Sequence, residues 1–427
     1  MKYDLVIKEV AIINADNNKK YNIGVTNGII NFIGQEDISG NYTILGNGQV
    51  AVPGMVNTHT HAAMTLFRSY ADDMVLMDWL QNKIWPAEAN LNPNDIYWGT
   101  QLAIAEMLKT GTTCFADMYF AEDKVAQAVE ETGIKASLSR GLTGLDDSAD
   151  AKLKENVEFF KNWHNKAEGR IKVMLGPHAP YTCPVPFLKK IIAAAANIGA
   201  ELHMHLSETK GEVEECVKNN GLTPIALMNE LGMFDLGTLA AHCVYVNDAD
   251  LDIMAKKRVR VAHNPQSNLK LASGIAPVNA MLKKDILVGL GTDGASSNNN
   301  LDMLEEARLA AMLQKTTTGD PTAVSASQAL TMATVMGAKA LGFTDCGEIK
   351  IGNKADLVLY DMSKPYWYPR HNLTSLFIYA ANASDASTVV VDGKVLMEKG
   401  ELLTIDIERV YSEANSCAKR LTMKNKE

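Results

Sequence analysis

Two of the chain's nine histidines stand two residues apart, in the segment "PGMVNTHTHAAMTLFRS" at residues 53–69. Side chains at positions i and i+2 of a β-strand point to the same face, so His59 and His61 are expected to lie side by side. Two adjacent imidazoles are either a packing accident or half of a metal site. The rest of the sequence has to supply the other half.

Further ionisable side chains follow short apolar runs later in the chain. A histidine buried alone is more often a packed core residue than a ligand. Unrelated packing would not place so many polar residues at the same ends of successive runs, so the set indicates one shared site. Its members are His178, His205, Glu208, His242, His263 and Asp293.

Eight apolar runs alternate with amphipathic helical stretches, from "AVPGMVNTHTH" at 51–61 to "ILVGLGTDGAS" at 286–296. Helical patterns such as those at 95–111, 187–199 and 301–315 separate them. Eight strands with intervening helices predict a parallel (β/α)8 TIM-like barrel. A doubly wound open sheet remains the alternative from the pattern, although no G-x-G-x-x-G turn follows the first strand.

The flanks of the chain have a different character. "YNIGVTNGIINFIG" alternates around Asn27-Gly28, and "STVVVDGKVLMEKG" is broken by Asp392-Gly393, two hairpin signals. Neither flank has enough strands to bury a core alone. We therefore expect residues 1–55 plus 345–427 to form one small β-sandwich domain with a C-terminal helix, and residues 56–344 to form the barrel.

In such a barrel the strand ends meet at one mouth, where active sites lie. His59, His61, His205 and Asp293 are the predicted ligands of one divalent metal ion, zinc by preference, with one coordination position open for water. His203 is an alternative to His205. A second metal would need a bridging ligand, often a lysine at the fourth strand end, and "VMLGPHAP" has none.

Two residues near these ligands have the chemistry to move a proton or steady a charge. Glu208, three residues after His205, can take a proton from bound water and pass it on. Its alternative is a carboxylate that caps the following helix. His242 can hydrogen-bond the same water, and its alternative is a buried histidine in "AAHCVYV".

Composition restricts the partners. The 427 residues are 47% hydrophobic and 21% charged, with a net charge of −9 and no basic run before the tail "KRLTMKNK", which we expect to be a solvated helix end. This argues against a nucleic-acid partner.

No apolar span long enough for a membrane helix and no signal peptide are expected. Six cysteines without a C-x-x-C pair predict reduced thiols in a cytoplasmic protein. A homo-oligomer is left open.

The motifs together resemble the amidohydrolase superfamily, and within it the 5-methylthioadenosine/S-adenosylhomocysteine deaminases. The likeness covers nearly the whole chain, including "PGMVNTHTHAAMTLFRS", "HMHLSET", "AHNPQSNLKLASG" and "GTDGASSNNNLDM". It implies the same four metal ligands, Glu208 as proton shuttle and His242 as the group that polarises the attacking water. It also implies substrate contacts by Glu88 with the ribose, His178 with the purine, and Arg140 near the ribose or amino-acid end.

The resemblance implies hydrolytic deamination of an adenine nucleoside to the inosine derivative, with Glu208 also facing the substrate and Asp293 taking a proton. Such enzymes often carry a second arginine shortly after the first, where this chain has only Lys152 and Lys154. Lysine is a flexible point charge, so methylthioadenosine or adenosine is expected to be preferred over the amino-acid-bearing substrate. The alternatives are guanine or cytosine deamination, triazine dechlorination, or a non-catalytic scaffold.

Overall fold

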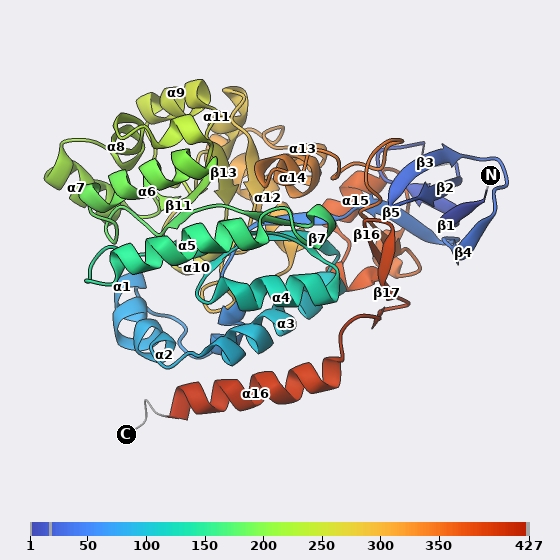
Figure 1. The fold of residues 1–427 in the computed structure, drawn as a ribbon. Coiled ribbons are helices and arrows are strands. Elements are labelled where there is room, and N and C mark those ends of the chain that lie inside the picture. The colour runs from blue at the N-terminus through green and yellow to red at the C-terminus, as the bar shows by residue number, and fades with distance from the viewer. Residues whose placement is uncertain (1, 17–18, 424–427) are drawn as a thin grey trace.

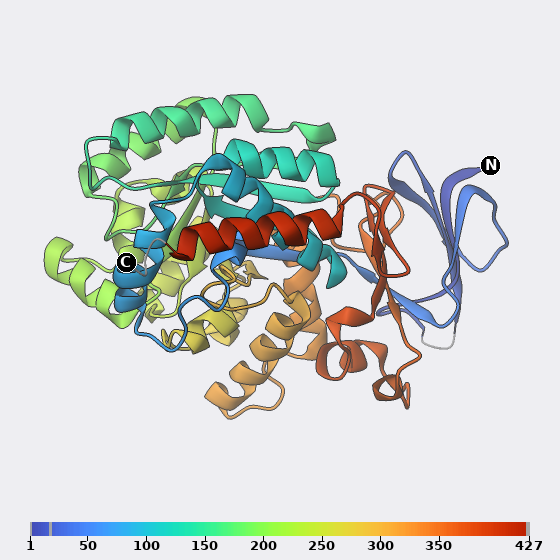
Figure 2. The ribbon, with the colours of Figure 1, turned by 90° about the horizontal axis from the view of Figure 1, so that it is seen from below.

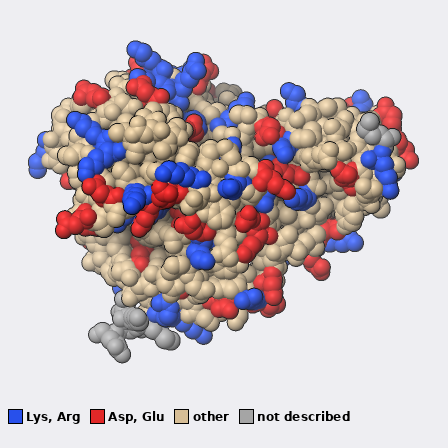
Figure 3. Space-filling view, in the orientation of Figure 1, with Lys and Arg blue, Asp and Glu red and all other residues tan. Residues whose placement is uncertain are grey.

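The computed structural model describes residues 2–16 and 19–423, which form a barrel, a separate sheet at one side and a long C-terminal helix (Figure 1). Residues 424–427, the end of the predicted basic tail, lie outside the described residues. Lys and Arg are intermixed with Asp and Glu over the face shown in Figure 3. Among the described residues, no helix has both the length and the apolar character needed to cross a membrane.

The barrel is a closed ring of parallel strands. Strand β14 pairs with β6, and a bridge between Leu175 and Leu202 joins the fourth and fifth positions of the ring. This closure confirms the predicted (β/α)8 barrel and excludes the open sheet. The strands are β6 (Met55–Thr60), β7 (Thr112–Tyr119), β8 (Lys135–Leu142), β9 (Ile171–Val173) continued by β10 (Gly176–Pro177), β11 (Leu202–Leu206), β12 (Thr238–His242), β13 (Arg260–His263) and β14 (Val288–Leu290).

Helices cover the outside of this ring, and side-chain caps fix where several of them begin. Asn92 and Asp95 form a reciprocal capping box at the start of α3, as Asn247 and Asp250 do for α9. The three helices predicted from periodicity are present as α3, α6 and α12. The principal helices are α3 (Pro93–Lys109), α4 (Glu122–Thr132), α5 (Ala149–Trp163), α6 (Val185–Ile198), α7 (Lys210–Asn220), α8 (Pro224–Glu230), α9 (Asp248–Lys257), α10 (Pro265–Lys270), α11 (Val278–Lys283), α12 (Met303–Thr318) and α13 (Ala326–Thr331).

The two ends of the chain form one mixed sheet, in which β5 lies between β1 and β15. Successive side chains of a strand face two different cores. Val358 of β15 packs into the large core shared with the barrel, and Leu357 and Leu359 pack into a second core. We propose that the chain passes between two domains near residue 54 and again before β15. The strands are β1 (Tyr3–Ile12), β2 (Tyr21–Thr26), β3 (Ile29–Gly34), β4 (Gly40–Leu45), β5 (Gln49–Pro53), β15 (Leu357–Asp361), β16 (Ala386–Val391), β17 (Lys394–Glu398) and β18 (Glu401–Leu402).

Both predicted hairpin turns are present, and they touch each other. Asn27 and Gly28 have φ of 52° and 76°, and Asp392 and Gly393 have 47° and 74°. A Cβ atom on Gly28 would lie 2.6 Å from the carbonyl oxygen of Asp392. Glycine at position 28 therefore lets hairpins from opposite ends of the sequence meet.

The C-terminal helix α16 (Ile407–Met423) runs along the barrel beside α3 (Figure 2). Arg420 pairs with Asp95, and it donates to the carbonyl of Asn90 at 3.2 Å. Asn90 follows the chain segment that connects β6 to α3. This segment comprises η1 (Ala62–Phe67), α1 (Leu76–Trp79), the π-helical turn η2 (Leu80–Ile84) and α2 (Trp85–Glu88).

Candidate active site

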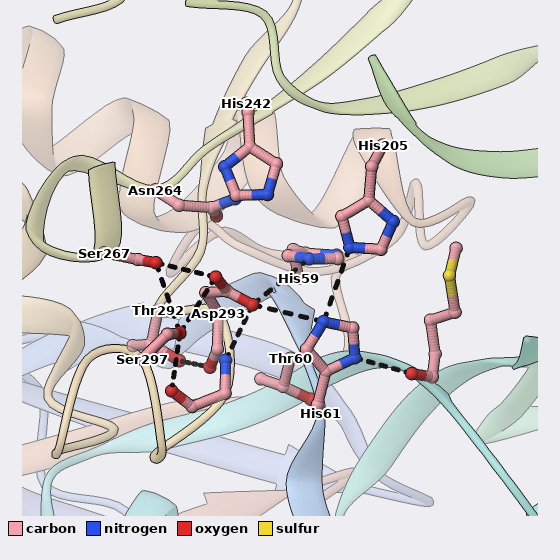
Figure 4. Close-up of polar contacts among 12 residues, drawn as sticks. His59, Thr60, His61, His205, His242, Asn264, Ser267, Thr292, Asp293 and Ser297 are labelled. Carbon is pink, nitrogen blue, oxygen red and sulfur yellow. Dashed lines mark hydrogen bonds and ion pairs between the residues drawn. The ribbon is translucent and has the colours of Figure 1, made fainter. Parts of the chain in front are cut away.

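Three imidazoles and one carboxylate converge at the mouth of the barrel (Figure 4). Nε2 of His61 lies 3.2 Å from Oδ1 of Asp293 and 3.4 Å from Nε2 of His205. Nε2 of His59 lies 3.5 Å from the same carboxylate oxygen. Atoms bound to one zinc ion at its usual ligand distances lie about 3.0–3.5 Å apart. Three of the four predicted ligands, His59, His61 and Asp293, therefore have the spacing of one coordination sphere, and His205 contacts His61 beside them.

The outer nitrogen of each imidazole has a partner that leaves Nε2 directed at the centre. Nδ1 of His61 lies 2.6 Å from the carbonyl of Met118, and Nδ1 of His205 lies 2.8 Å from the carbonyl of His178. A carbonyl only accepts, so these Nδ1 atoms carry the protons and the Nε2 lone pairs are available to a cation. The buried Nε2 of His59 has no well-aligned hydrogen-bond partner among the described residues. This donor set fits a divalent metal.

Asp293 is held by several donors of its own. Its Oδ2 accepts from the hydroxyls of Ser267 at 2.7 Å and Ser297 at 3.0 Å. Burial would raise the pKa of Asp293, but the neighbouring imidazoles of His59 and His61 hold it well below its usual range. Burial opposes protonation of His61, yet the hydrogen bond and charge of Asp293 raise its pKa to about 9. A cation binding between these two residues would compete with that proton.

The backbone is unusual where the strands deliver these side chains. His242 and Asp293 have φ of 72° and 61°, a conformation that residues other than glycine seldom adopt. A Cβ on Gly291 would lie 2.4 Å from Oδ1 of Asn264 and 2.8 Å from the amide nitrogen of His59. Glycine thus lets the end of β14 approach β6 closely enough to bring Asp293 to the imidazoles.

Glu208 and His242 face each other beside this cluster. Oε2 of Glu208 lies 3.9 Å from Nε2 of His242, and its Oε1 accepts from Ser273 at 3.2 Å. The predicted alternative, a helix cap, is supplied instead by Thr209, which accepts from the amide of Glu212. Burial raises the pKa of Glu208, partly offset by His242. Glu208 is thus suited to hold a proton.

His242 also lies close to the metal-ligand cluster, since ligand atoms of His59, His205 and His242 all lie within 4.8 Å of one another. Its Nδ1 is 2.8 Å from Oδ1 of Asn268 and 3.3 Å from Nδ2 of Asn264, and the shorter contact, to an acceptor, favours a proton on Nδ1 and leaves Nε2 toward Glu208. His242 is therefore placed between the cluster and the carboxylate.

A cavity of about 640 Å³ opens above the cluster. Its floor includes His61, His205 and Asp293, and its outer walls are largely apolar. A deep polar end and an apolar mouth are typical of sites for small organic ligands. The apolar residues of the outer part are Met64, Trp79, Leu80, Trp85, Phe120, Leu145 and Leu271.

Three of the four predicted substrate contacts line this cavity: Glu88, His178 and Glu208. Glu88 accepts a 2.6 Å hydrogen bond from the hydroxyl of Tyr119, and His178 lies beside His205 with ring centres 4.8 Å apart. Burial lowers the pKa of His178 to about 3, so its ring is neutral. Arg140 lies at the same rim but is not among the described residues that line the cavity; its guanidinium reaches Glu155 of α5 at 2.8 Å.

Of the two lysines that follow Arg140, Lys152 lines the cavity and Lys154 is exposed. Nζ of Lys152 lies 2.9 Å from Oδ2 of Asp146 and 3.2 Å from the hydroxyl of Thr143. The ammonium group of Lys152 is therefore already paired with the carboxylate of Asp146.

Sequence reasoning missed several residues that touch the site. Tyr119 directly follows the predicted strand "TTCFADM", and its place at a strand end was a usable signal. Ser139 and Glu212 lie behind the site, where no residue pattern indicates a supporting role, and His203, the predicted alternative to His205, lies there too. His203 lies 2.9 Å from Nδ1 of His59 on the side away from the other ligands, so it contacts a predicted ligand without facing the centre.

Comparison with known proteins gives a consistent result. The sequence profile of the amidohydrolase family matches residues 50–396. A curated 5-methylthioadenosine/S-adenosylhomocysteine deaminase from Dictyoglomus thermophilum is 56% identical over 384 residues, which is 90% of each chain. A deaminase of the same name from Thermoanaerobacter pseudethanolicus is 46% identical over 98% of this chain and 99% of its own.

Among solved structures, an adenosine deaminase from Xanthomonas campestris with bound zinc superposes with a TM-score of 0.95 at 34% identity, covering 99% of each chain. An atrazine chlorohydrolase from Arthrobacter aurescens in complex with zinc has a TM-score of 0.89 at 24% identity, over 97% of this chain and 100% of that one. At that identity the second likeness concerns the fold alone.

Proposed function

Because this chain belongs to the amidohydrolase family, we propose that it is a metal-dependent enzyme that deaminates adenine nucleosides, with 5'-methylthioadenosine as the preferred substrate. Its curated relatives are deaminases, so the chain is a hydrolase that acts on C–N bonds. The reaction consumes water and releases ammonia and the inosine derivative. A small nucleoside fits both the relatives' shared name and the size of the cavity.

The observation that supports the proposal is the cluster of His59, His61 and Asp293 in the cavity, with His205 in contact with His61 and Glu208 buried nearby. His59, His61, His205 and Asp293 would hold the ion, and we propose zinc, which the adenosine deaminase relative binds. When bound, such a cation polarises water so that it loses a proton near neutral pH. Free, buried cysteines support a reducing, cytoplasmic location for the enzyme.

The proton transfers fall to side chains of this chain. Glu208 takes a proton from the attacking water and delivers it to N1 of the purine, while burial favours its protonated form. His242 accepts a hydrogen bond from the attacking water through Nε2 and so orients it toward C6. Asp293 accepts the remaining hydroxyl proton, which passes to the amine so that ammonia leaves as a neutral molecule.

Other residues orient the nucleoside. The carboxylate of Glu88 would accept hydrogen bonds from the two ribose hydroxyls, and His178 would contact the purine through its neutral ring. The apolar mouth would then receive the 5' substituent and exclude water from it. We place Arg140 in a supporting role at the rim, because its guanidinium is paired with Glu155.

The test is a side-by-side assay of methylthioadenosine, S-adenosylhomocysteine, adenosine, guanine, cytosine and a chlorinated triazine, with ammonia and chloride both measured. We expect ammonia from the adenine nucleosides, with the highest kcat/KM for methylthioadenosine. Zinc content measured after chelation and reconstitution should follow the activity. Ammonia from guanine or cytosine alone, chloride from the triazine, or a reconstituted protein without metal would each overturn the proposal.

A further inference from the structure

A chain of hydrogen bonds leads from the metal cluster into the barrel interior. Nδ1 of His59 lies 2.9 Å from Nε2 of His203. Nδ1 of His203 lies 3.1 Å from the hydroxyl of Ser139, and that hydroxyl donates to the carbonyl of Asp117 at 2.8 Å. All four residues are buried, so water does not compete for these contacts.

The end of this chain determines the direction of every bond in it. A backbone carbonyl only accepts, so the Ser139 hydroxyl donates its hydrogen to the carbonyl of Asp117. Its oxygen can then accept a hydrogen bond from His203. Nδ1 of His203 then carries a proton and its Nε2 accepts. Nδ1 of His59 must therefore be the donor, which leaves the lone pair of His59 Nε2 directed at the cluster.

The opposite assignment would disable the site. If His203 donated to His59, the proton of His59 would lie on Nε2 and point toward Oδ1 of Asp293, 3.5 Å away. An N–H group cannot bind a cation. The same N–H group of His59 would also donate a hydrogen bond to Asp293. The cluster thus has two self-consistent states, and the hydroxyl of Ser139 selects the one that accepts metal.

We propose that Ser139 and His203 are positioning residues that fix the tautomer of His59 and so set the affinity of the site for a divalent cation. The inference rests on the proposed metal-dependent function. It separates His203 from the ligands: His203 acts through His59 and does not touch the ion. Loss of such a supporting contact lowers metal affinity about 10- to 100-fold in comparable sites.

The chain offers a matched control on the same strand. Ser137 lies two residues before Ser139 in β8, is equally buried, and its hydroxyl has no hydrogen-bond partner among the described residues. Ser139→Ala and Ser137→Ala therefore remove the same atom from neighbouring positions of one face, but only the first breaks the relay.

The experiment measures zinc affinity of the purified full-length protein by competition with a chromophoric chelator, together with the Tm of the metal-free form. We expect Ser139→Ala to bind zinc about tenfold or more weakly, His203→Phe at least as weakly, and Ser137→Ala like the unaltered protein. His203→Phe keeps an aromatic ring in the space and so preserves packing.

Equal zinc affinity in Ser139→Ala and the unaltered protein would overturn the relay, as would weaker binding that Ser137→Ala shares. A lower Tm in Ser139→Ala without a change in zinc affinity would assign it a structural role only. If the unaltered protein binds zinc but releases no ammonia, the proposed function fails while the relay stands.

Discussion

The hydroxyl of Tyr119 donates a 2.6 Å hydrogen bond to Oε1 of Glu88, joining the end of barrel strand β7 to the helix α2 above the cavity. Both side chains line the cavity. Burial raises the pKa of Glu88 to about 7, and the Tyr119 hydrogen bond opposes that rise. Tyr119 therefore holds the carboxylate in one orientation and leaves its second oxygen for a ligand.

Replacing this tyrosine should weaken ribose recognition. Tyr119→Phe keeps the ring but removes the hydroxyl, so we expect KM for adenosine or methylthioadenosine to rise roughly tenfold, about 1.4 kcal/mol, with kcat nearly unchanged. KM for 2',3'-dideoxyadenosine, which lacks both hydroxyls, should not respond. Tyr97→Phe is the control, because Tyr97 makes a 2.6 Å hydrogen bond to Glu131 on the protein surface. An equal rise in KM for the dideoxy compound would contradict this role.

Glu208 should be needed for turnover but not for metal binding. Glu208→Gln keeps the shape and removes the site for a proton, so kcat should fall about 10²- to 10⁴-fold while the zinc content stays at that of the unaltered protein. The rate of ammonia release measures kcat, and metal analysis measures the zinc content. Glu214→Gln, on the exposed side of α7, should retain full activity. A near-full rate in Glu208→Gln would remove the proposed shuttle.

The barrel and the position of the cluster could be predicted because both depend on local pattern. Apolar runs of strand length end in polar residues, and in a parallel barrel those ends meet at one mouth. The two-residue period of a strand was enough to predict that His59 and His61 lie side by side. Asp293 was recognisable from the end of the eighth run, although its left-handed backbone and the close approach at Gly291 were not.

The supporting contacts could not be predicted, because they depend on side-chain directions across the barrel. His203 and His205 share a face of β11, and only the packed structure shows that the first turns to His59 while the second turns to His61. Arg140 is predicted to lie beside the substrate, and the structure adds that its guanidinium pairs with Glu155 on α5. Nothing in the sequence marks Glu155 as that partner.

The ion pair at the cavity mouth should set the preference between substrates. Lys152 is held by Asp146, so a substrate carboxylate must compete for its charge. We expect Asp146→Asn to raise kcat/KM for S-adenosylhomocysteine severalfold relative to methylthioadenosine, and Lys152→Met to lower that ratio. Lys154→Met, an exposed neighbour outside the cavity, should leave it unchanged. If all three variants show the same ratio, the pair does not contribute to specificity.

A buried ion pair joins the terminal sheet to the bottom of the barrel. Lys135, at the start of β8, pairs with Asp356 and lies 2.6 Å from Asp392 in the β16–β17 turn, and all three side chains are less than a tenth exposed. Each partner compensates the cost of burying the other. The pairing with Asp356 and Asp392 keeps the pKa of Lys135 above its usual value although burial opposes this.

Removing that cation should destabilise the protein without touching the active site. Lys135→Met leaves the buried Asp356 without its lysine and Asp392 with only the more distant Lys354 at 3.9 Å, so we expect the free energy of unfolding to fall by about 3–5 kcal/mol, measured by urea denaturation. Lys394→Met is the matched control: Lys394 of β17 also pairs with a barrel residue, Glu168, but both side chains are exposed, so stability should change little. If the two variants unfold at the same urea concentration, the buried pair does not stabilise the junction; zinc affinity should be unchanged in both.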